Sequence, residues 1–152
     1  MSHDCMFKVR FHLNPEDEQE FETESLWAEP VAPGQFRIGN CPFFVFGVSL
    51  DDIVQARETE NGLEFEQVIA RSGHSTYRVY LQGGLTLLDP EFKECWERIE
   101  RLGAFFESAN DRLAAIDIPP GKDSAAIYRL LEEGADLGIW AFEEGHYEPE
   151  HN

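Results

Sequence analysis

Apolar and polar residues alternate near the start of the chain. From Phe7 to Leu13 an apolar residue occupies every second position, and this period of two predicts a half-buried β-strand. Three further runs have strand-like patterns, over residues 24–29, 35–38 and 63–70, and residues 48–58 suit a turn at Asp51 and Asp52 followed by another strand. Asn61-Gly62 is a hairpin turn signal between two of them, and a slip in the alternation near Gln67 indicates a β-bulge. Short strands at this close spacing predict a small antiparallel β-barrel or a curled sheet.

Helical spacing appears in the second half of the chain. Asp89 is an expected N-cap, Pro90 suits the first helical position, and apolar residues recur at helical intervals as far as Phe106. These features predict a first helix that begins at residue 90. Asp123 is the expected N-cap of a second helix, and Gly134 is its expected C-terminal stop. Strands are predicted around the helices, over residues 76–81, 112–118 and 137–142.

The order of these elements indicates the fold. In the second half a strand, a helix, a strand, a helix and a strand follow one another, which fits a split β-α-β (ferredoxin-like) unit with two helices on one face of a sheet. We therefore expect an α+β protein. A β-rich subdomain is predicted over residues 1–72 and a β-α-β-α-β subdomain over residues 73–152, and the two are expected to form one compact unit.

The charge of the chain limits the classes of partner that it can bind. Thirty acidic residues against twelve Lys and Arg give the 152 residues a formal net charge of −18. This charge repels phosphate backbones and anionic lipids, so we expect neither nucleic-acid nor membrane-surface binding. It attracts basic proteins and speeds their encounter, although many acidic proteins carry such charge for solubility alone.

The acidic residues gather at the two ends of the chain. Residues 1–30 and residues 119–152 each carry eight acidic and two basic residues. If both ends fold onto one side, they form an acidic face for a basic partner; if they lie apart, the solubility role gains weight. Residues 16–24 are interpreted as a solvated acidic loop. The candidate binding residues are Glu16, Asp17, Glu18, Glu20, Glu22, Glu24, Glu143, Glu144 and Glu148.

The cysteines and the absence of long apolar runs bear on the compartment. Cys5, Cys41 and Cys95 lack the spacing of a metal site, and an odd, sparse set argues against a disulfide scaffold. No apolar run approaches the roughly 20 residues that span a bilayer, and the first residues do not have the pattern of a signal peptide. We therefore expect a cytoplasmic protein. No nucleotide-binding motif occurs, so no cofactor is expected.

Two short segments carry residues of the types used in catalysis. Residues 71–75 place Ser72 and His74 at a turn between two predicted strands, where functional side chains are often presented. Glu144 and His146 lie near the end of the last strand, and with His74 they would supply the ligand types of a zinc site. Neither segment has the spacing of a known catalytic motif. A hydrogen-bonded turn and a solvated strand end are the simpler interpretations.

Four motifs resemble those of a known family. They are Ser25-Leu26-Trp27-Ala28-Glu29, residues 40–48, the Arg-Ser-Gly-His-Ser-Thr-Tyr-Arg run of residues 71–78, and Glu143-Glu144-Gly145-His146. Together they resemble an uncharacterised bacterial family known only as a domain of unknown function. The resemblance spans nearly the whole chain. It implies a small stand-alone bacterial protein with no established activity, and it supplies no catalytic residues.

Three functions are consistent with these features. The first, which the charge favours, is an acidic cytoplasmic protein that neutralises or regulates a basic partner, most concretely a bacterial immunity protein against a toxin. The second is a metal-dependent or histidine-based hydrolase that uses His74, Glu144 and His146, with His74 and His146 as metal ligands. The third is a sensor domain that binds a small molecule in a pocket between the barrel and the helical half.

Overall fold

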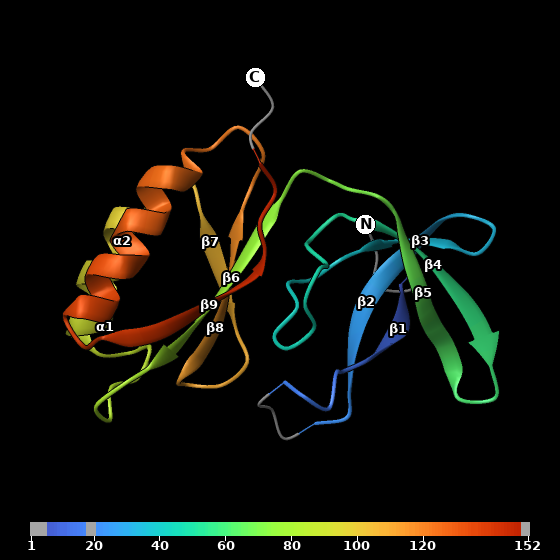
Figure 1. Cartoon of the computed structure of the whole chain (residues 1–152), viewed down its shortest axis with the longest axis horizontal. Helices are drawn as coiled ribbons and strands as arrows, with labels where there is room; N and C mark the ends of the chain where they lie inside the picture. The colour runs from blue at the N-terminus through green and yellow to red at the C-terminus, as the bar shows by residue number, and fades with distance from the viewer. Residues whose placement is uncertain (1–5, 18–20, 150–152) are drawn as a thin grey trace.

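The computed structural model describes residues 6–17 and 21–149 and forms two β-sheet units that lie side by side (Figure 1). The predicted α+β class is confirmed. In chain order the elements are β1 (Phe7–His12), β2 (Thr23–Ala32), β3 (Gln35–Ile38), β4 (Ile53–Thr59), β5 (Gly62–Ala70), β6 (Ser75–Leu81), α1 (Pro90–Glu100), β7 (Phe105–Ser108), β8 (Leu113–Ile118), α2 (Ser124–Asp136) and β9 (Trp140–His146).

The first unit is a closed barrel of β1 to β5, as the spacing of short strands predicted. Consecutive strands pair antiparallel, and because an odd number of strands follows in up-and-down order, β1 and β5 close the barrel as a parallel pair. Val9, Phe11 and Leu26 are among the buried side chains of its interior. Ala56 pairs with Phe65 but Gln55 with Gln67, so the ladder shifts at the predicted bulge.

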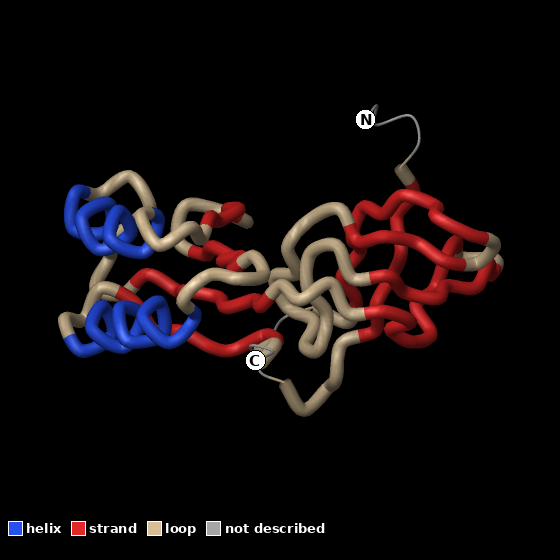
Figure 2. The backbone as a smooth tube through the Cα atoms, turned by 90° about the horizontal axis from the view of Figure 1, so that it is seen from above, coloured by secondary structure: helices blue, strands red, loops and turns tan. Residues whose placement is uncertain are grey.

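The second unit is a four-stranded antiparallel sheet in the order β7-β8-β6-β9, with α1 and α2 on one face (Figure 2). This arrangement confirms the predicted split, ferredoxin-like unit. The apolar stripe of α1, which includes Phe92, Trp96 and Ile99, packs with residues of α2 and with the helix-facing side of β6. The barrel ends at Ala70 and the second sheet begins at Ser75, on either side of position 72.

Two predicted helix ends are wrong. Phe106 lies on β7, a strand that the pattern did not reveal, because α1 ends at Glu100 and a turn follows. The Phe106 ring packs edge-on against Trp96, with 4.9 Å between ring centroids, so it joins the same core that a longer helix would have reached. Gly134 lies inside α2 rather than at its end. A Cβ atom there would come within 2.4 Å of the Trp140 ring, which explains why this helical position lacks a side chain.

Residues 39–52, called the connector below, join β3 to β4 and lie between the barrel and the second sheet (Figures 1 and 2). They cover the sheet face that the helices leave open. Since side chains alternate along a strand, β6 directs Tyr77 and Val79 into the helical core, whereas Thr76 and Arg78 contact the connector. No helix within the described residues is long and apolar enough to cross a membrane.

Candidate functional site

His74 lies where the chain passes from the barrel to the second sheet. Its Nδ1 is 2.9 Å from both carboxylate oxygens of Asp117 on β8, and its Nε2 is 3.5 Å from an oxygen of Asp51 in the connector. Asp117 is fully buried. The hydrogen bonds with Asp117 raise the pKa of His74, and burial raises the pKa of Asp117 although His74 opposes that shift. His74 is thus held by an acid on each side.

Ser72 orders the turn instead of facing the imidazole. Its hydroxyl donates to the carbonyl oxygen of Leu50 at 2.7 Å and accepts the backbone N–H of His74 at 3.1 Å. The Ser72 N–H donates to Asp52, a buried carboxylate that also accepts the N–H of Ser49 and a guanidinium N–H of Arg71. These contacts match the simpler interpretation of a hydrogen-bonded turn.

Two buried charged side chains hold the connector from opposite sides. Glu24, on β2, is 9% exposed, and its carboxylate accepts the backbone N–H groups of Phe43, Phe44 and Val45 at 2.7–3.0 Å. Its interpretation as part of a solvated loop is therefore wrong, because a buried carboxylate takes the place of strand partners for these amides. Arg78, on β6, is fully buried and donates to the carbonyl oxygens of Phe44 and Val45.

The segment with Glu144 and His146 lies on β9, beside β6. Arg78 donates to Glu143 at 2.9 Å, Tyr77 donates to Glu144 at 3.3 Å, and His146 pairs with Glu148 at 2.9 Å. Among the described residues no hydrogen bond or ion pair joins His74 to His146 or either histidine to Glu144. Within the same residues no group of three His, Cys, Asp or Glu side chains is placed to hold a metal ion.

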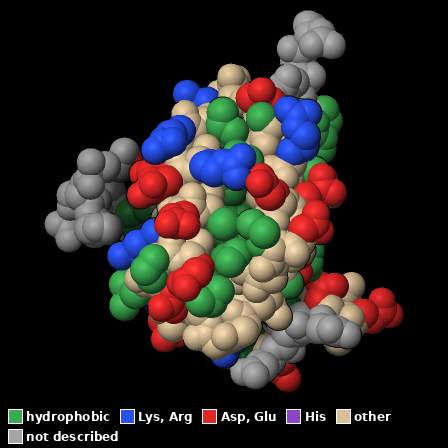
Figure 3. Space-filling model, turned by 90° about the vertical axis from the view of Figure 1, so that its left-hand side faces the viewer, with side chains coloured by type: hydrophobic (Ala, Val, Ile, Leu, Met, Phe, Trp, Pro, Cys, Tyr) green, Lys and Arg blue, Asp and Glu red, His purple; other side chains and the backbone are tan. Residues whose placement is uncertain are grey.

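The candidate acidic residues do not share one environment. Glu16, Asp17 and Glu22 lie in the loop between β1 and β2, and Glu18 and Glu20 of this loop lie outside the described residues. Glu24, Glu143 and Glu148 have the internal partners described above. In Figure 1 the β1–β2 loop lies at the lower edge of the molecule, whereas the segment after β9 runs toward its upper edge. The outer side of the helices carries both acidic and basic side chains (Figure 3).

Cys41 lies at the base of the connector and is buried. Its backbone N–H donates to Glu107 on β7 at 3.2 Å. Burial, and then the nearby Glu107, raise the pKa of the Cys41 thiol far above its ordinary value. A thiol held protonated in this way is a poor nucleophile, so the side chain acts as part of the packing.

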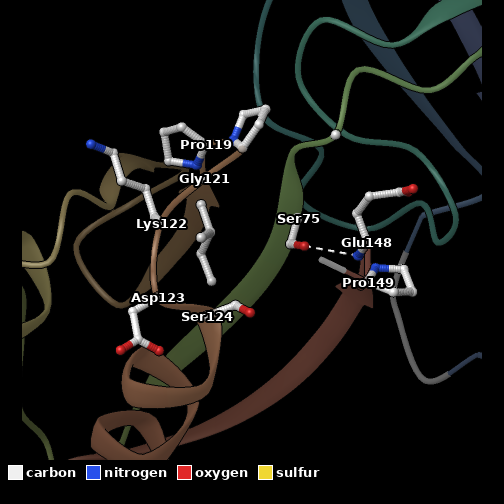
Figure 4. A pocket seen from close by; sticks show the side chains of 11 residues that line it. Ser75, Pro119, Gly121, Lys122, Asp123, Ser124, Glu148 and Pro149 are labelled. Carbon is white, nitrogen blue, oxygen red and sulfur yellow. Dashed lines mark hydrogen bonds between the residues drawn. The ribbon is translucent and has the colours of Figure 1, made fainter. Parts of the chain in front are cut away.

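A cleft opens at the N-terminal end of α2 (Figure 4). Its volume is about 640 Å³, and it lies between the loop from β8 to α2, the start of β6 and the segment after β9. Ser75 is 3% exposed, and its hydroxyl accepts the N–H of Glu148 at 2.8 Å. The other lining residues are Gly73, Ile118, Pro119, Pro120, Gly121, Lys122, Asp123, Ser124 and Pro149.

A second concavity of about 430 Å³ adjoins this cleft and shares Ser124 with it. Tyr77, Tyr128 and Tyr147 form much of its wall, and the Tyr77 and Tyr128 rings meet edge-on at 6.1 Å between centroids. Burial is the main cause that raises the pKa of Tyr77, and the neighbouring Glu144 adds to it, so its hydroxyl stays protonated. The two concavities together make a groove, called the α2 groove below, with a polar end and an aromatic end.

Sequence reasoning did not identify the α2 groove. Asp123 was correctly predicted as the N-cap of α2, and its carboxylate accepts the N–H of Ala126 at 3.0 Å. That prediction already placed Ser124 at the start of the helix. That prediction could not show that Ser75 lies near Ser124 in the fold. Nor could it show that tyrosines from three different segments line the same groove.

Comparisons with known proteins agree with the fold. The structure is similar to the crystal structure of a hypothetical protein from Neisseria gonorrhoeae, with a TM-score of 0.79 and 20% sequence identity over 93% of this chain and 95% of that chain. A comparison with curated proteins gives no match. The family model of the domain of unknown function DUF4265 matches residues 24–142, more than half of the chain. The family resemblance is thereby confirmed over a range that contains three of the four motifs, and the protein belongs to the DUF4265 family.

Proposed function

We propose that this protein binds a small molecule in the α2 groove. The observation that carries the proposal is that two adjoining concavities, of about 640 and 430 Å³, share the lining residue Ser124. Ligand sites in proteins typically have volumes of about 300–1,000 Å³ and combine an apolar wall with a few polar groups. The groove has this composition, since tyrosine rings line one end and serine hydroxyls the other.

The contacts around the groove favour binding over catalysis. Of the residues that the structure describes, no histidine or cysteine lines either concavity, and Tyr77 and Glu144 are hydrogen-bonded to each other. The acidic partners of His74 lie in the connector and on β8, whereas His146 pairs with Glu148 of the cleft wall. Among the described residues no histidine or carboxylate is hydrogen-bonded to the hydroxyl of Ser75 or Ser124, so neither serine has the adjacent base of a catalytic nucleophile. The proposal is of the same class as the third function considered from the sequence, a ligand-binding or sensor domain. The α2 groove lies in the second unit, however, and not between the barrel and the helical half, where that function placed its pocket.

Binding to a basic protein remains a prediction from the net charge of −18. The exposed acids of the β1–β2 loop, Glu16 and Glu22, are its remaining described support in the first part of the chain. Since Glu24, Glu143 and Glu148 already have internal partners, the surface offered to such a protein is smaller than the sequence suggested.

A ligand screen with a blocked variant tests the proposal. The full chain would be screened by thermal shift against a chemically diverse set of metabolites, and hits would be measured by calorimetry. Ala125 is an exposed residue of α2 that lines the aromatic end, so Ala125→Trp should fill the groove at little cost in folding. We expect at least one ligand that stabilises the wild type and loses about tenfold or more in affinity for Ala125→Trp.

The matched control is Ala32→Trp, which places the same side chain at an exposed position of β2 in the barrel. It should bind the ligand as the wild type does. Hits that bind Ala125→Trp and the wild type equally would show that binding occurs elsewhere, and the proposal would then be rejected.

A further inference from the structure

We infer that the ligand of the α2 groove carries an anionic oxygen group, a phosphate or a carboxylate, at the polar end of the groove. The inference rests on the proposed function and specifies the chemistry of the same site. The hydroxyl-bearing residues Ser124 and Ser75 line this end, and Ala125, with its backbone N–H, follows in the first turn of α2. The α2 helix, with 13 residues, is long enough to present a positive dipole end at this point.

Ser124 provides the most direct support. The residue is 8% exposed, yet within the described residues its hydroxyl has no hydrogen-bond partner. Figure 4 shows this hydroxyl on the cleft side of the helix end. Because the hydroxyl faces the cleft and has no partner among these residues, it is free to donate a hydrogen bond to a ligand there.

The neighbouring donors are free to bind the same group. Ser75 accepts the N–H of Glu148, which leaves the proton of the Ser75 hydroxyl available to donate. At the helix end the N–H of Ser124 donates to the carbonyl of Lys122 and the N–H of Ala126 to Asp123. The N–H of Ala125, between them, has no partner among the residues that the structure describes.

The charged side chains around this end do not occupy the space between the donors. The Asp123 carboxylate caps the helix and the Glu148 carboxylate binds His146, so both are engaged. In Figure 4 the Asp123 carboxylate and the Lys122 ammonium both point away from the cleft. Lys122 is exposed and forms no ion pair within the described part of the chain.

The aromatic end of the groove specifies the rest of the ligand. Tyr128 and Tyr147 are each about 40% exposed, so part of each ring is accessible in the groove. A planar ring stacked against them would reach the polar end through Ser124, which lines both concavities. An aryl phosphate or an aryl carboxylate therefore combines the two chemistries that the groove presents.

An NMR titration of the full chain tests this inference. Phenyl phosphate, inorganic phosphate, benzoate and the neutral phenol would be added separately while the backbone amide signals are followed. We expect phenyl phosphate or benzoate to shift the amide signal of Ala125 in a saturable way and to bind at least tenfold more tightly than phenol. The response to phosphate alone against benzoate distinguishes the two anionic groups.

Ser124→Ala is the matched variant, because it removes the hydroxyl and breaks no hydrogen bond among residues 6–17 and 21–149. It should weaken binding of the aryl anion about tenfold or more, since hydrogen bonds to charged groups are strong. Ser25→Ala, at an exposed serine of β2, should have no effect.

The possible results separate this inference from the proposed function. Equal binding of phenol and of the aryl anions, with no effect of Ser124→Ala, would overturn the inference and leave a neutral ligand for the same groove. The inference is also overturned if no anion shifts the amide signal of Ala125 while the screen yields a ligand whose binding Ala125→Trp blocks. If the screen yields no such ligand and no anion shifts Ala125, both proposals fail.

Discussion

Polar side chains are buried in two regions of the molecule, the contact between the connector and the second sheet and the α2 groove. The two regions differ in whether these side chains find hydrogen-bond partners within the protein. At the connector each of these buried charges is hydrogen-bonded within the protein. Arg78 donates to two backbone carbonyls and to Glu143, and Glu24 accepts from three backbone amides. In the groove the Ser124 hydroxyl has no partner among the described residues. Fully paired polar groups serve the fold, whereas an unpaired one in a concavity points to a ligand.

Removal of a paired charge at the connector should have the largest effect. Arg78→Met takes away the guanidinium that holds the carbonyls of Phe44 and Val45, and it leaves Glu143 without its cation. We expect a loss of about 3–5 kcal/mol in the free energy of unfolding, measured by urea denaturation. Arg57→Met, at an exposed arginine of β4, should change it by less than about 0.5 kcal/mol. Similar values for the two variants would contradict the structural role of Arg78.

The ion pair of His74 should make stability depend on pH. The groups around its ring are Asp117 on β8 and Asp51 and Asp52 in the connector. Since the pKa of His74 is raised above its ordinary 6.5 in the folded protein, its contribution is complete below pH 6.5 and is lost as pH rises through the folded pKa. The wild type should therefore lose stability relative to His74→Gln as pH rises from about 6.

The contribution of His74 to the free energy of unfolding is best measured near pH 6, where the imidazole is charged. At pH 6 the His74→Gln variant should be less stable by about 1–3 kcal/mol, because it loses a hydrogen bond to a buried carboxylate. The difference between the two proteins should shrink above pH 6.5. A difference that stays constant from pH 6 to pH 9 would show that the imidazole does not carry a charge in the folded protein.

The smallest effect is expected in the groove. Ser124→Ala should change the free energy of unfolding by less than about 0.5 kcal/mol, or increase it, because the hydroxyl has no partner to lose. Ser49→Ala is the contrasting variant at the connector. The Ser49 hydroxyl is fully buried and lies 2.7 Å from that of Thr76, so its removal should cost about 1–2 kcal/mol. Equal losses in denaturation experiments would erase the difference between the two regions.

Periodicity in the sequence was sufficient for most of the fold. The alternation from Phe7 onward predicted β1, and the cap at Asp89-Pro90 placed the start of α1. The pattern failed at Phe106, because an apolar residue that suits both a helical and a strand period carries no information about which element it is in. It also failed at Gly134, where the close approach of Trp140 rather than a helix end requires glycine.

The partners of charged residues were beyond such patterns. Glu24 stands in an acidic run, and Asp117 stands among apolar residues of a strand, but only the folded chain brings the amides of residues 43–45 to Glu24 and the imidazole of His74 to Asp117. The Arg71-Ser72-Gly73-His74-Ser75 motif was correctly singled out as a turn rich in polar groups. Its contacts lie with the connector and with β8, two segments distant in the chain, so its role could not be derived from its own sequence.

The connector has a consequence for how the length of this protein can vary. Loops without regular structure usually accept insertions and deletions. Residues 43–45, however, are bound on their amides by Glu24 and two of them on their carbonyls by Arg78, so one added residue there would displace contacts to both sheets. The turn at Asn61-Gly62 is exposed at the tip of a hairpin and has no such double attachment. Variation in chain length is therefore expected at this turn, while the irregular segment between the sheets is as fixed in length as a central strand.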